Sequence, residues 1–263
     1  MSRIDDTSQF RDTWDGFADI YDQWTAFHDH ATWARQLDAL ARAGGDLGRR
    51  LLDVGCGTGA STAALRELGY EPVGVDVSQR MLELAAARLG PDVELHRHDM
   101  RELPVLGQFD LISCVSDGLN YLLDEASLVA TFDGFRRNLA PGGRVVFDVD
   151  TLAAFRKLYS SLIVLPQPDR VVIFDGRAER SPQAGDLADA VVEVLTPAAS
   201  PWWSRTRAIH RQRHHPQSTI EAALRSAGLA PVAVWGTDGA GGSEQPLDDK
   251  RHNKAVYIAQ LAA

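Results

Sequence analysis

Residues 51–60, with the sequence LLDVGCGTGA, constrain the fold more than any other stretch of this chain. Two apolar residues and an acid come first, then three glycines alternate with small residues, and residues 61–68 continue in a pattern typical of a helix. We predict a strand, a tight loop and a helix. Alternate glycines let a loop turn sharply and let a ligand approach bare backbone. The start of the helix then offers free N–H groups to a polar or anionic ligand group.

The glycine loop by itself is compatible with several protein classes. Gly55, Gly57 and Ala60 also satisfy the dinucleotide fingerprint G-x-G-x-x-G/A, and Asp76 lies at about the spacing of roughly 20 residues expected for its acid. A plain tight turn in an α/β protein is a third interpretation. Asp53, directly before the glycines, and the segments downstream separate these alternatives.

Four more segments follow the glycine loop and carry short motifs. They are residues 73–78 (VGVDVS), 98–100 (HDM), 109–112 (FDLI) and 139–143 (LAPGG). Together with residues 51–60 they resemble, in content and in order, the motifs of class I S-adenosylmethionine-dependent methyltransferases. The resemblance covers roughly residues 17–150, and within the family it points to small-molecule enzymes of the amino-sugar N,N-dimethyltransferase type.

Strands alternate with helices along the first part of the chain, which implies βαβ units and a mostly parallel sheet. Ligands of such sheets bind at the carboxyl ends of the strands. The predicted fold class is α/β: a Rossmann-like, mostly parallel seven-stranded sheet with helices on both faces, plus an antiparallel β insertion or lid after the fifth strand. The expected strands are residues 51–54, 72–77, 93–97, 109–115, 144–149, 231–235 and 255–261.

Four regions are expected. Residues 1–45 form an N-terminal lid and helices, although residues 1–13 are polar and are predicted to be loose. Residues 46–150 form the cofactor-binding core, and residues 151–215 form an antiparallel insertion on the substrate side with three strands. Residues 216–263 add a helix and the last strands, which complete the core.

The resemblance implies that the cofactor is S-adenosyl-L-methionine and the product S-adenosyl-L-homocysteine. Asp76 ends the second strand, and its two oxygens suit a ribose diol, whereas Asp99 suits the exocyclic amine of adenine. The alternative for both is an exposed acid at a strand end. Asp53 is expected to orient the loop or to meet the methionyl amino group. The other residues expected to bind the cofactor are Gly55, Cys56, Gly57, Gly59, Val77, Met81, Met100 and Val115, with Cys56 a small packed residue rather than a nucleophile.

The catalytic candidates lie in two segments. Tyr121 and Asp117 follow the fourth strand, where family members position the methyl donor and acceptor; they hold the acceptor, take its proton, or are structural. Tyr21 belongs to an aromatic N-terminal segment that resembles a lid over the cofactor or substrate, the alternative being packing on the sheet edge. A neutral amine acceptor needs only to arrive deprotonated, whereas a hydroxyl or an acidic carbon needs a base.

Aromatic and basic residues mix in residues 202–215, inside the insertion. This run is interpreted as a wall of the acceptor pocket, as an RNA-contacting strand, or as an edge strand with protective charge. His214 and His215 are neighbours on one strand and point to opposite faces. His28 and His30 flank Asp29 without a second pair of ligands. We therefore expect no metal site.

Composition limits the partners and the location. The net charge of −9 disfavours phosphate backbones, which argues against a nucleic-acid partner without excluding one. Two cysteines form no disulfide framework, and the sequence has no apolar signal core and no run of membrane-spanning length. The expectation is a cytoplasmic protein with a small-molecule acceptor and no membrane partner, and a homodimer stays open.

The predicted function is transfer of a methyl group from S-adenosylmethionine to a small molecule, with an amine nitrogen as the first candidate. Oxygen or carbon methylation and RNA or protein methylation are the enzymatic alternatives. An NAD-type oxidoreductase shares the glycines and Asp76 but does not account for Asp53, Asp99 and residues 141–143 together. A cofactor-binding regulatory module also remains, although such a module needs no private insertion.

Overall fold

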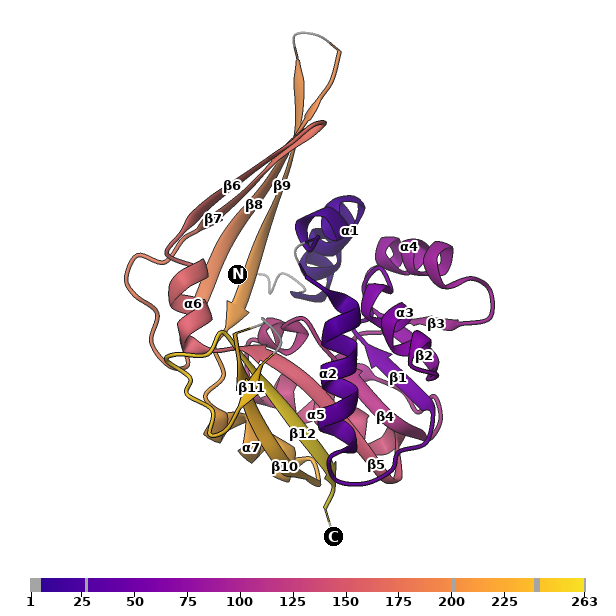
Figure 1. Cartoon of the computed structure of the whole chain (residues 1–263). Coiled ribbons are helices and arrows are strands. Elements are labelled where there is room, and N and C mark those ends of the chain that lie inside the picture. The colour runs from indigo at the N-terminus through magenta and orange to yellow at the C-terminus, as the bar shows by residue number, and fades with distance from the viewer. Residues whose placement is uncertain (1–5, 27, 200–201, 239–241, 263) are drawn as a thin grey trace.

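The computed structural model describes residues 6–26, 28–199, 202–238 and 242–262. Its larger sheet has eight strands in the order β11-β10-β12-β5-β4-β1-β2-β3 (Figure 1). These strands are β1 (Arg50–Val54), β2 (Glu71–Asp76), β3 (Glu94–Arg97), β4 (Phe109–Cys114), β5 (Leu139–Asp150), β10 (Leu229–Thr237), β11 (Ser243–Glu244) and β12 (Lys254–Leu261). The accompanying helices are α2 (His30–Arg42), α3 (Ala60–Glu67), α4 (Gln79–Leu89), α5 (Glu125–Asn138) and α7 (Gln217–Ser226), with the short 3-10 helices η1 (Met100–Glu102) and η2 (Gly118–Tyr121).

The strand order reverses at β1. Strands β3, β2, β1, β4 and β5 run parallel, with β2 and β3 on one side of β1 and β4 and β5 on the other. A reversal of this kind leaves a crevice at the carboxyl ends of the strands, where open α/β sheets bind their ligands. Strand β12 pairs with β5 in antiparallel orientation, and β10 pairs antiparallel with β12, so β10 runs in the same direction as β5. The predicted α/β fold is confirmed, and the two-residue strand β11 adds to it within a segment expected to be a loop.

Alternate residues of the inner strands face opposite layers of helices. Leu52 of β1 packs in one core cluster with Phe132 of α5, whereas its neighbour Leu51 packs in another with Trp33 of α2 and Leu65 of α3. All are buried. Burial of each large apolar side chain contributes about 1.5–3 kcal/mol, so the two clusters hold the sheet between its helices.

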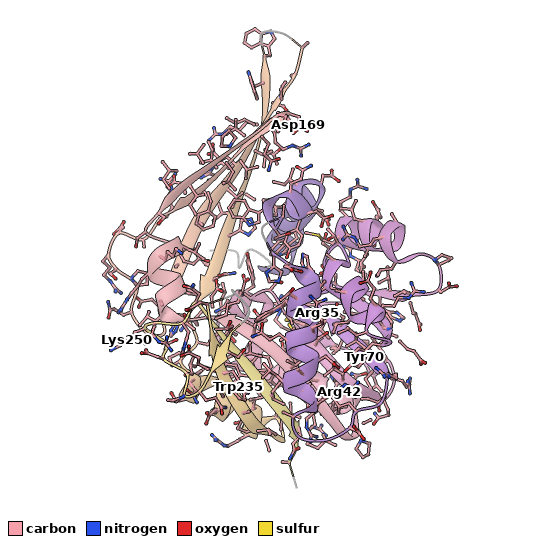
Figure 2. All side chains as sticks on the ribbon, viewed as in Figure 1. Arg35, Arg42, Tyr70, Asp169, Trp235 and Lys250 are labelled. Atoms are coloured by element: carbon pink, nitrogen blue, oxygen red, sulfur yellow. The ribbon has the colours of Figure 1, made fainter. Side chains whose placement is uncertain are left out.

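Helix α2 is fastened to the main sheet near its C-terminal end. Arg42 donates to the Tyr70 hydroxyl, with 3.0 Å between Nη2 and Oη, and the two side chains lie close together in Figure 2. Asp38 accepts hydrogen bonds from both, at 2.7 Å from Arg42 Nε and 2.5 Å from Tyr70 Oη. The opposite end of α2, which begins at His30, is thereby held beside the glycine loop.

Between β5 and α7 the chain leaves the main sheet and forms the insertion. It contains α6 (Leu152–Leu158) and a four-stranded antiparallel sheet in the order β6-β7-β8-β9, which projects from the main sheet in Figure 1. Its strands are β6 (Leu162–Gln167), β7 (Arg170–Gly176), β8 (Leu187–Pro197) and β9 (Trp203–Arg213). The prediction of three strands misses β6. Pro166 breaks the strand signal there, but proline is tolerated in an edge strand, and β6 is one.

The N-terminal helix α1 (Asp6–Trp24) corrects the prediction that residues 1–13 are loose. Residues 1–5 lie outside the described part of the chain. Helix α1 lies between the insertion and α4 (Figure 1). Its buried Phe17 and Ile20 share a core cluster with Phe174 of β7 and Val192 of β8. Helices are stabilised mainly by packing of one face, which a polar beginning does not reveal.

Candidate active site

A cavity of about 280 Å³ lies at the carboxyl ends of β1, β2 and β4. Its walls come from the glycine loop, the segments after β2, β3 and β4, helix α1 and the insertion strands β8 and β9. The predicted residues that line it are Tyr21, Gly55, Gly57, Asp76, Val77, Met81, Asp99, Met100, Val115 and Tyr121. The remaining lining residues are Trp14, Val54, His98, Arg101, Ser116, Gly118, Leu122, Leu123, Asp189, Ile209 and Arg211.

The glycine loop presents bare backbone to this cavity. Gly57 has a φ of +54°, and a Cβ placed on it would lie 3.8 Å from Cε1 of Tyr21. Its N–H donates to Asp76 Oδ2 at 2.9 Å, and the N–H groups of Gly55 and Cys56 donate to the carbonyl of Val75 at 2.7 and 3.0 Å. The loop is therefore tied to the end of β2 in a conformation that favours glycine.

Asp76 is placed to accept hydrogen bonds from a ligand. Its Oδ1 accepts from the N–H of Ser78 at 2.9 Å, and its Oδ2 accepts from Gly57. Burial raises the pKa of this carboxyl to about 6, against the effect of these backbone hydrogen bonds. Each carboxylate oxygen has a further lone pair, so the pair of oxygens fits two neighbouring hydroxyl groups.

An apolar slot with an acid at its end lies next to Asp76. Val77, Met81 and Met100 form its apolar part. Asp99 accepts from the N–H of Arg101 at 2.9 Å and pairs with the Arg101 guanidinium, with 2.6 Å between Oδ2 and Nη2. A flat heterocycle with an amino group fits this combination of thioether, apolar and carboxylate surfaces.

Four predicted residues do not line the main cavity. Asp53 is buried, where it accepts from Thr62 Oγ1 at 2.5 Å and Ser113 Oγ at 2.6 Å, and it joins β1 to α3 and β4. Burial raises its pKa. Gly59, with a φ of +78°, packs on α4, and Asp117 turns toward Lys254. Asp53 and Cys56 instead line a narrow recess of about 20 Å³.

The loop after β4 has a strained backbone. Ser116 and Asp117 have φ values of +63° and +54°, which residues with a Cβ rarely adopt. Asp148 of β5 holds both, because its carboxylate accepts their N–H groups at 2.9 and 2.8 Å. Strain of this kind persists only where the surroundings stabilise it. The loop thereby places Ser116 and Gly118 in the cavity wall.

A partly buried acid–lysine cluster supports that loop: Asp117, Asp148, Asp150 and Lys254. The Lys254 ammonium lies 3.1, 3.0 and 3.0 Å from carboxylate oxygens of the three acids. Burial opposes its charge, but the carboxylates outweigh that effect and raise its pKa well above the ordinary value. For Asp150, by contrast, burial is the main effect, and it raises the pKa to about 7. Asp148, Asp150 and Lys254 are not among the predicted site residues, although acids at two alternate positions of the buried strand β5 were a signal.

Neutral aromatic and phenolic groups form the side of the cavity that faces α1 and β9. Tyr121 Oη lies 2.9 Å from Nδ1 of His210 in β9. His210 is buried, and burial lowers its pKa to about 4. Burial also raises the pKa values of Tyr21 and Tyr121 above their ordinary range. The Trp14 ring meets the rings of Tyr121 and Tyr21 edge-on, at 5.1 and 6.0 Å between centroids. Both phenols are therefore uncharged near neutral pH.

The insertion contributes an ion pair and an apolar side chain to the cavity. Arg211 of β9 and Asp189 of β8 are paired across the strands by two hydrogen bonds of 2.6 Å each. Ile209 lies two residues before Arg211 on the same strand face. Strand β9 is an edge strand of the insertion sheet.

Two further properties follow from the described residues. Within residues 6–26, 28–199, 202–238 and 242–262, no three His, Cys, Asp or Glu side chains gather as metal ligands would. None of the helices in these ranges is both long and apolar enough to cross a bilayer.

Comparisons with known proteins agree with this geometry. Residues 51–143 match the family model of a methyltransferase domain. The chain is 30% identical over 196 residues to the cypemycin N-terminal methyltransferase of a Streptomyces species, covering 73% of this chain and 76% of that protein. It is 34% identical over 157 residues to the dTDP-4-amino-2,3,4,6-tetradeoxy-D-glucose N,N-dimethyltransferase of Saccharopolyspora spinosa, covering 56% and 61%. A solved S-adenosylmethionine-dependent methyltransferase from Clostridium acetobutylicum has the same fold, with a TM-score of 0.79 over 94% of this chain and 98% of that one at 23% identity.

The fold and the cavity define a class I S-adenosylmethionine-dependent methyltransferase, as the motifs predict. The chain belongs to the methyltransferase family represented by that domain, and it is an enzyme whose cofactor is S-adenosylmethionine. The residues present fit this cofactor: a glycine backbone open to approach, a carboxylate at the end of β2 and an apolar slot closed by a second carboxylate.

Proposed function

We propose that this enzyme methylates an amine nitrogen of a small molecule. We assign the acceptor to the side of the cavity formed by Trp14, Tyr21, Tyr121, Asp189 and Arg211. The observation that carries the proposal is that the described titratable groups on this side are poorly suited to act as a base. The Asp189 carboxylate is paired with the Arg211 guanidinium. Tyr21 and Tyr121 have raised pKa values, and burial keeps His210 neutral and weakly basic. An amine attacks through its own lone pair, whereas a hydroxyl must first lose a proton to a base.

The names of the relatives support the same choice. One similar protein is an N,N-dimethyltransferase of an amino sugar, and another is an N-terminal methyltransferase. The first name denotes methylation at nitrogen, and the second denotes methylation at an N-terminus. We assign this chemistry to the present chain as well, with a small polar amine such as an amino sugar as the acceptor class.

We assign the cofactor to the residues that line the crevice. Asp76 would accept from the ribose hydroxyls, and Asp99 from the adenine amine, with Val77, Met81 and Met100 against the ring. The glycine loop would face the methionyl part. When bound, the cofactor supplies an electrophilic methyl group on a sulfonium. Tyr21, which lies over Gly57, would cover this group with an aromatic face and exclude water.

In the mechanism that we propose, most of the rate acceleration comes from positioning the acceptor against the methyl group. Methyl transfer is an in-line displacement, so the acceptor nitrogen must lie in line with the methyl group and its leaving group. Tyr121 would accept a hydrogen bond from the amine and so direct its lone pair, while His210 fixes the phenol. Asp117 does not line the cavity, and its proposed role is indirect, through the conformation of the strained loop. After transfer, the excess N–H proton leaves to solvent.

The acceptor is assigned to the space between the core and the insertion, residues 151–215. Asp189, Ile209 and Arg211 reach the cavity from that side. Three of the four arginines of β9 lie within ion-pair distance of an acid on β8: Arg205 and Arg207 share Glu193, and Arg211 pairs with Asp189. This matching supports a small-molecule acceptor over a nucleic acid. A cytoplasmic location and a homodimer stay predictions from the sequence.

Product analysis tests the proposal. The purified enzyme is incubated with S-adenosylmethionine and matched pairs of sugars or sugar nucleotides, one carrying an amine and the other a hydroxyl at the same carbon. Mass spectrometry should find one or two added methyl groups on the amine only. Methylation of the hydroxyl partner, with the amine unchanged, would show that a base was overlooked.

A further inference from the structure

The side chain of Gln212 lies where the insertion meets the loop after β4. It belongs to β9 and is only 3% exposed. Its Nε2 donates to Oδ2 of Asp117 at 2.7 Å, and its Oε1 accepts from Oη of Tyr159, the buried residue that follows α6, also at 2.7 Å. A carboxylate can only accept hydrogen bonds, so the amide nitrogen must face Asp117 and the amide oxygen must face the tyrosine.

The same amide also contacts Tyr121. Burial raises the pKa of Tyr121, and a hydrogen bond from Gln212 opposes this rise. A side-chain amide has two N–H donors, so one can serve the carboxylate and the other the phenol oxygen. On its far side the Tyr121 hydroxyl lies 2.9 Å from Nδ1 of His210. With an amide donor on one side and an imidazole on the other, the phenol is held in one orientation.

These contacts fasten β9 to the loop after β4. Besides the bonds of Gln212, Nδ2 of Asn120 donates to the carbonyl of Arg213 at 2.9 Å. Lys254 of the core lies 3.1 Å from Oδ1 of Asp117, so the core holds one oxygen of this carboxylate and the insertion holds the other. The φ of +54° at Asp117 is strained, and such a conformation persists only where its surroundings fix it.

The loop and the phenol that Gln212 holds both face the cavity. Ser116, Gly118 and Tyr121 line it, whereas Gln212 is not a lining residue and acts through these neighbours. We propose that Gln212 is a positioning residue for methyl transfer: it fixes the loop through Asp117 and orients the Tyr121 hydroxyl. The contact of Tyr121 with the acceptor rests on the proposed function, whereas the hold on the loop does not.

Two substitutions separate the hydrogen bonds of Gln212 from its packing. Gln212→Met keeps the approximate size of the side chain and removes its N–H donors and its oxygen. Its kcat should fall by about 100-fold, the cost of a misplacement of about 1 Å at a reacting group, with a smaller change in KM for the acceptor. Gln212→Glu keeps the shape as well, but its carboxyl donates to Asp117 only when it is protonated.

The pH dependence of the glutamate variant tests the donor role. The new carboxyl would face Asp117, Tyr121 and Tyr159, with Lys254 behind the aspartate and His210 beside the first phenol. The lysine is already surrounded by three acids, so repulsion and burial favour the protonated form of a fourth. Turnover relative to the wild type should therefore recover as pH falls from 9 to 6, by up to about 10-fold per pH unit. The methionine variant should show no such recovery.

Two measurements need no acceptor. Amide hydrogen exchange of residues 116–121 should be about 10-fold faster in Gln212→Met, while exchange in the glycine loop stays unchanged. Calorimetry should give an affinity for S-adenosylhomocysteine within about 2-fold of the wild type, which also shows that the variant is folded. Gln23→Glu, which changes an exposed glutamine of α1 outside the cavity, is the matched control and should leave every readout unchanged.

The contrary outcomes are distinct. A wild-type kcat in Gln212→Met, or unchanged exchange of residues 116–121, would overturn the proposal. A loss of S-adenosylhomocysteine affinity as large as the loss of kcat would show that Gln212 supports the fold as a whole. A deficit of Gln212→Glu that is the same at every pH would assign the effect to packing. Methylation of a hydroxyl in place of an amine would refute the proposed function alone, because each readout compares a variant with the wild type on the same acceptor.

Discussion

Replacing Lys254 by methionine should destabilise the protein strongly, because it removes the cation from the acid–lysine cluster. The ammonium has contacts of 3.0–3.1 Å with three carboxylates, and its side chain is 21% exposed. Loss of one partner from a buried ion pair costs about 3–5 kcal/mol, since the remaining charge is left uncompensated. We expect a loss of that size in the free energy of unfolding at pH 8.

The loss should shrink at lower pH, and the sign follows from proton binding. The folded-state pKa of Asp150 is raised to about 7, above the ordinary value of 3.8, and removing the lysine raises it further. At pH values between the ordinary pKa of 3.8 and the raised pKa of Asp150, the folded variant binds more protons than the unfolded chain, so its stability falls as pH rises. Each extra proton contributes about 1.4 kcal/mol per pH unit. The deficit should therefore be smaller at pH 5 than at pH 8.

Urea unfolding of wild type, Lys254→Met and Lys250→Met at both pH values measures this. Lys250 is exposed and serves as the matched control (Figure 2). Its replacement should change stability by less than about 0.5 kcal/mol at either pH. A deficit for Lys254→Met that is equal at the two pH values, or below that of a surface change, would refute the cluster's role.

Three further predictions concern the site. Affinity for S-adenosylhomocysteine, measured by calorimetry, should fall as pH drops below about 6 because Asp76 becomes protonated there. The affinity of Asp76→Asn should not depend on pH in this range. Asp76→Ala should bind the ligand about 1.5–3 kcal/mol more weakly than the wild type at pH 8. Gly57→Ala should cost about 1–2 kcal/mol of stability from its φ of +54° and reduce cofactor binding, and a Tm equal to that of the wild type would contradict the argument. Tyr121→Phe should lower kcat without abolishing turnover. Arg211→Ala should raise KM for the acceptor and leave the affinity for the cofactor unchanged. An equal loss of affinity for the acceptor and for the cofactor would show that Arg211 is a structural support.

The local parts of the site were predictable because they depend on short-range chemistry. Glycines 55 and 57 have positive φ values, a property that a sequence of alternating glycines indicates directly. Asp76 and Asp99 follow strands whose period and turns are visible in the sequence, and both line the cavity. The strand alternation also predicted the mostly parallel sheet, and the structure shows that its strand order reverses at β1, where the crevice lies.

Residues far apart in the chain were not predictable, because a pattern of neighbours says nothing about register or crossing. Lys254 and Asp148 are 106 residues apart in the chain, and they are in contact only because β12 pairs with β5. Asp189 and Arg211 pair through the register of β8 and β9. For Asp53 the sequence left open whether it orients the glycine loop or meets the cofactor. In the structure it is buried and joins β1 to α3 and β4 through Thr62 and Ser113.

The sequence by itself thus determined the class of enzyme and the wall of the crevice formed by the glycine loop, Asp76 and Asp99, since strand period, glycine turns and acids at strand ends are local features of the sequence. Only the tertiary structure decided the opposite wall. The insertion, α1 and the strained loop after β4 come together there through packing and buried charge, with His210 of β9 against Tyr121 and Trp14. Such contacts depend on how separate elements dock, and docking is set by the summed burial of many side chains rather than by any one stretch of residues.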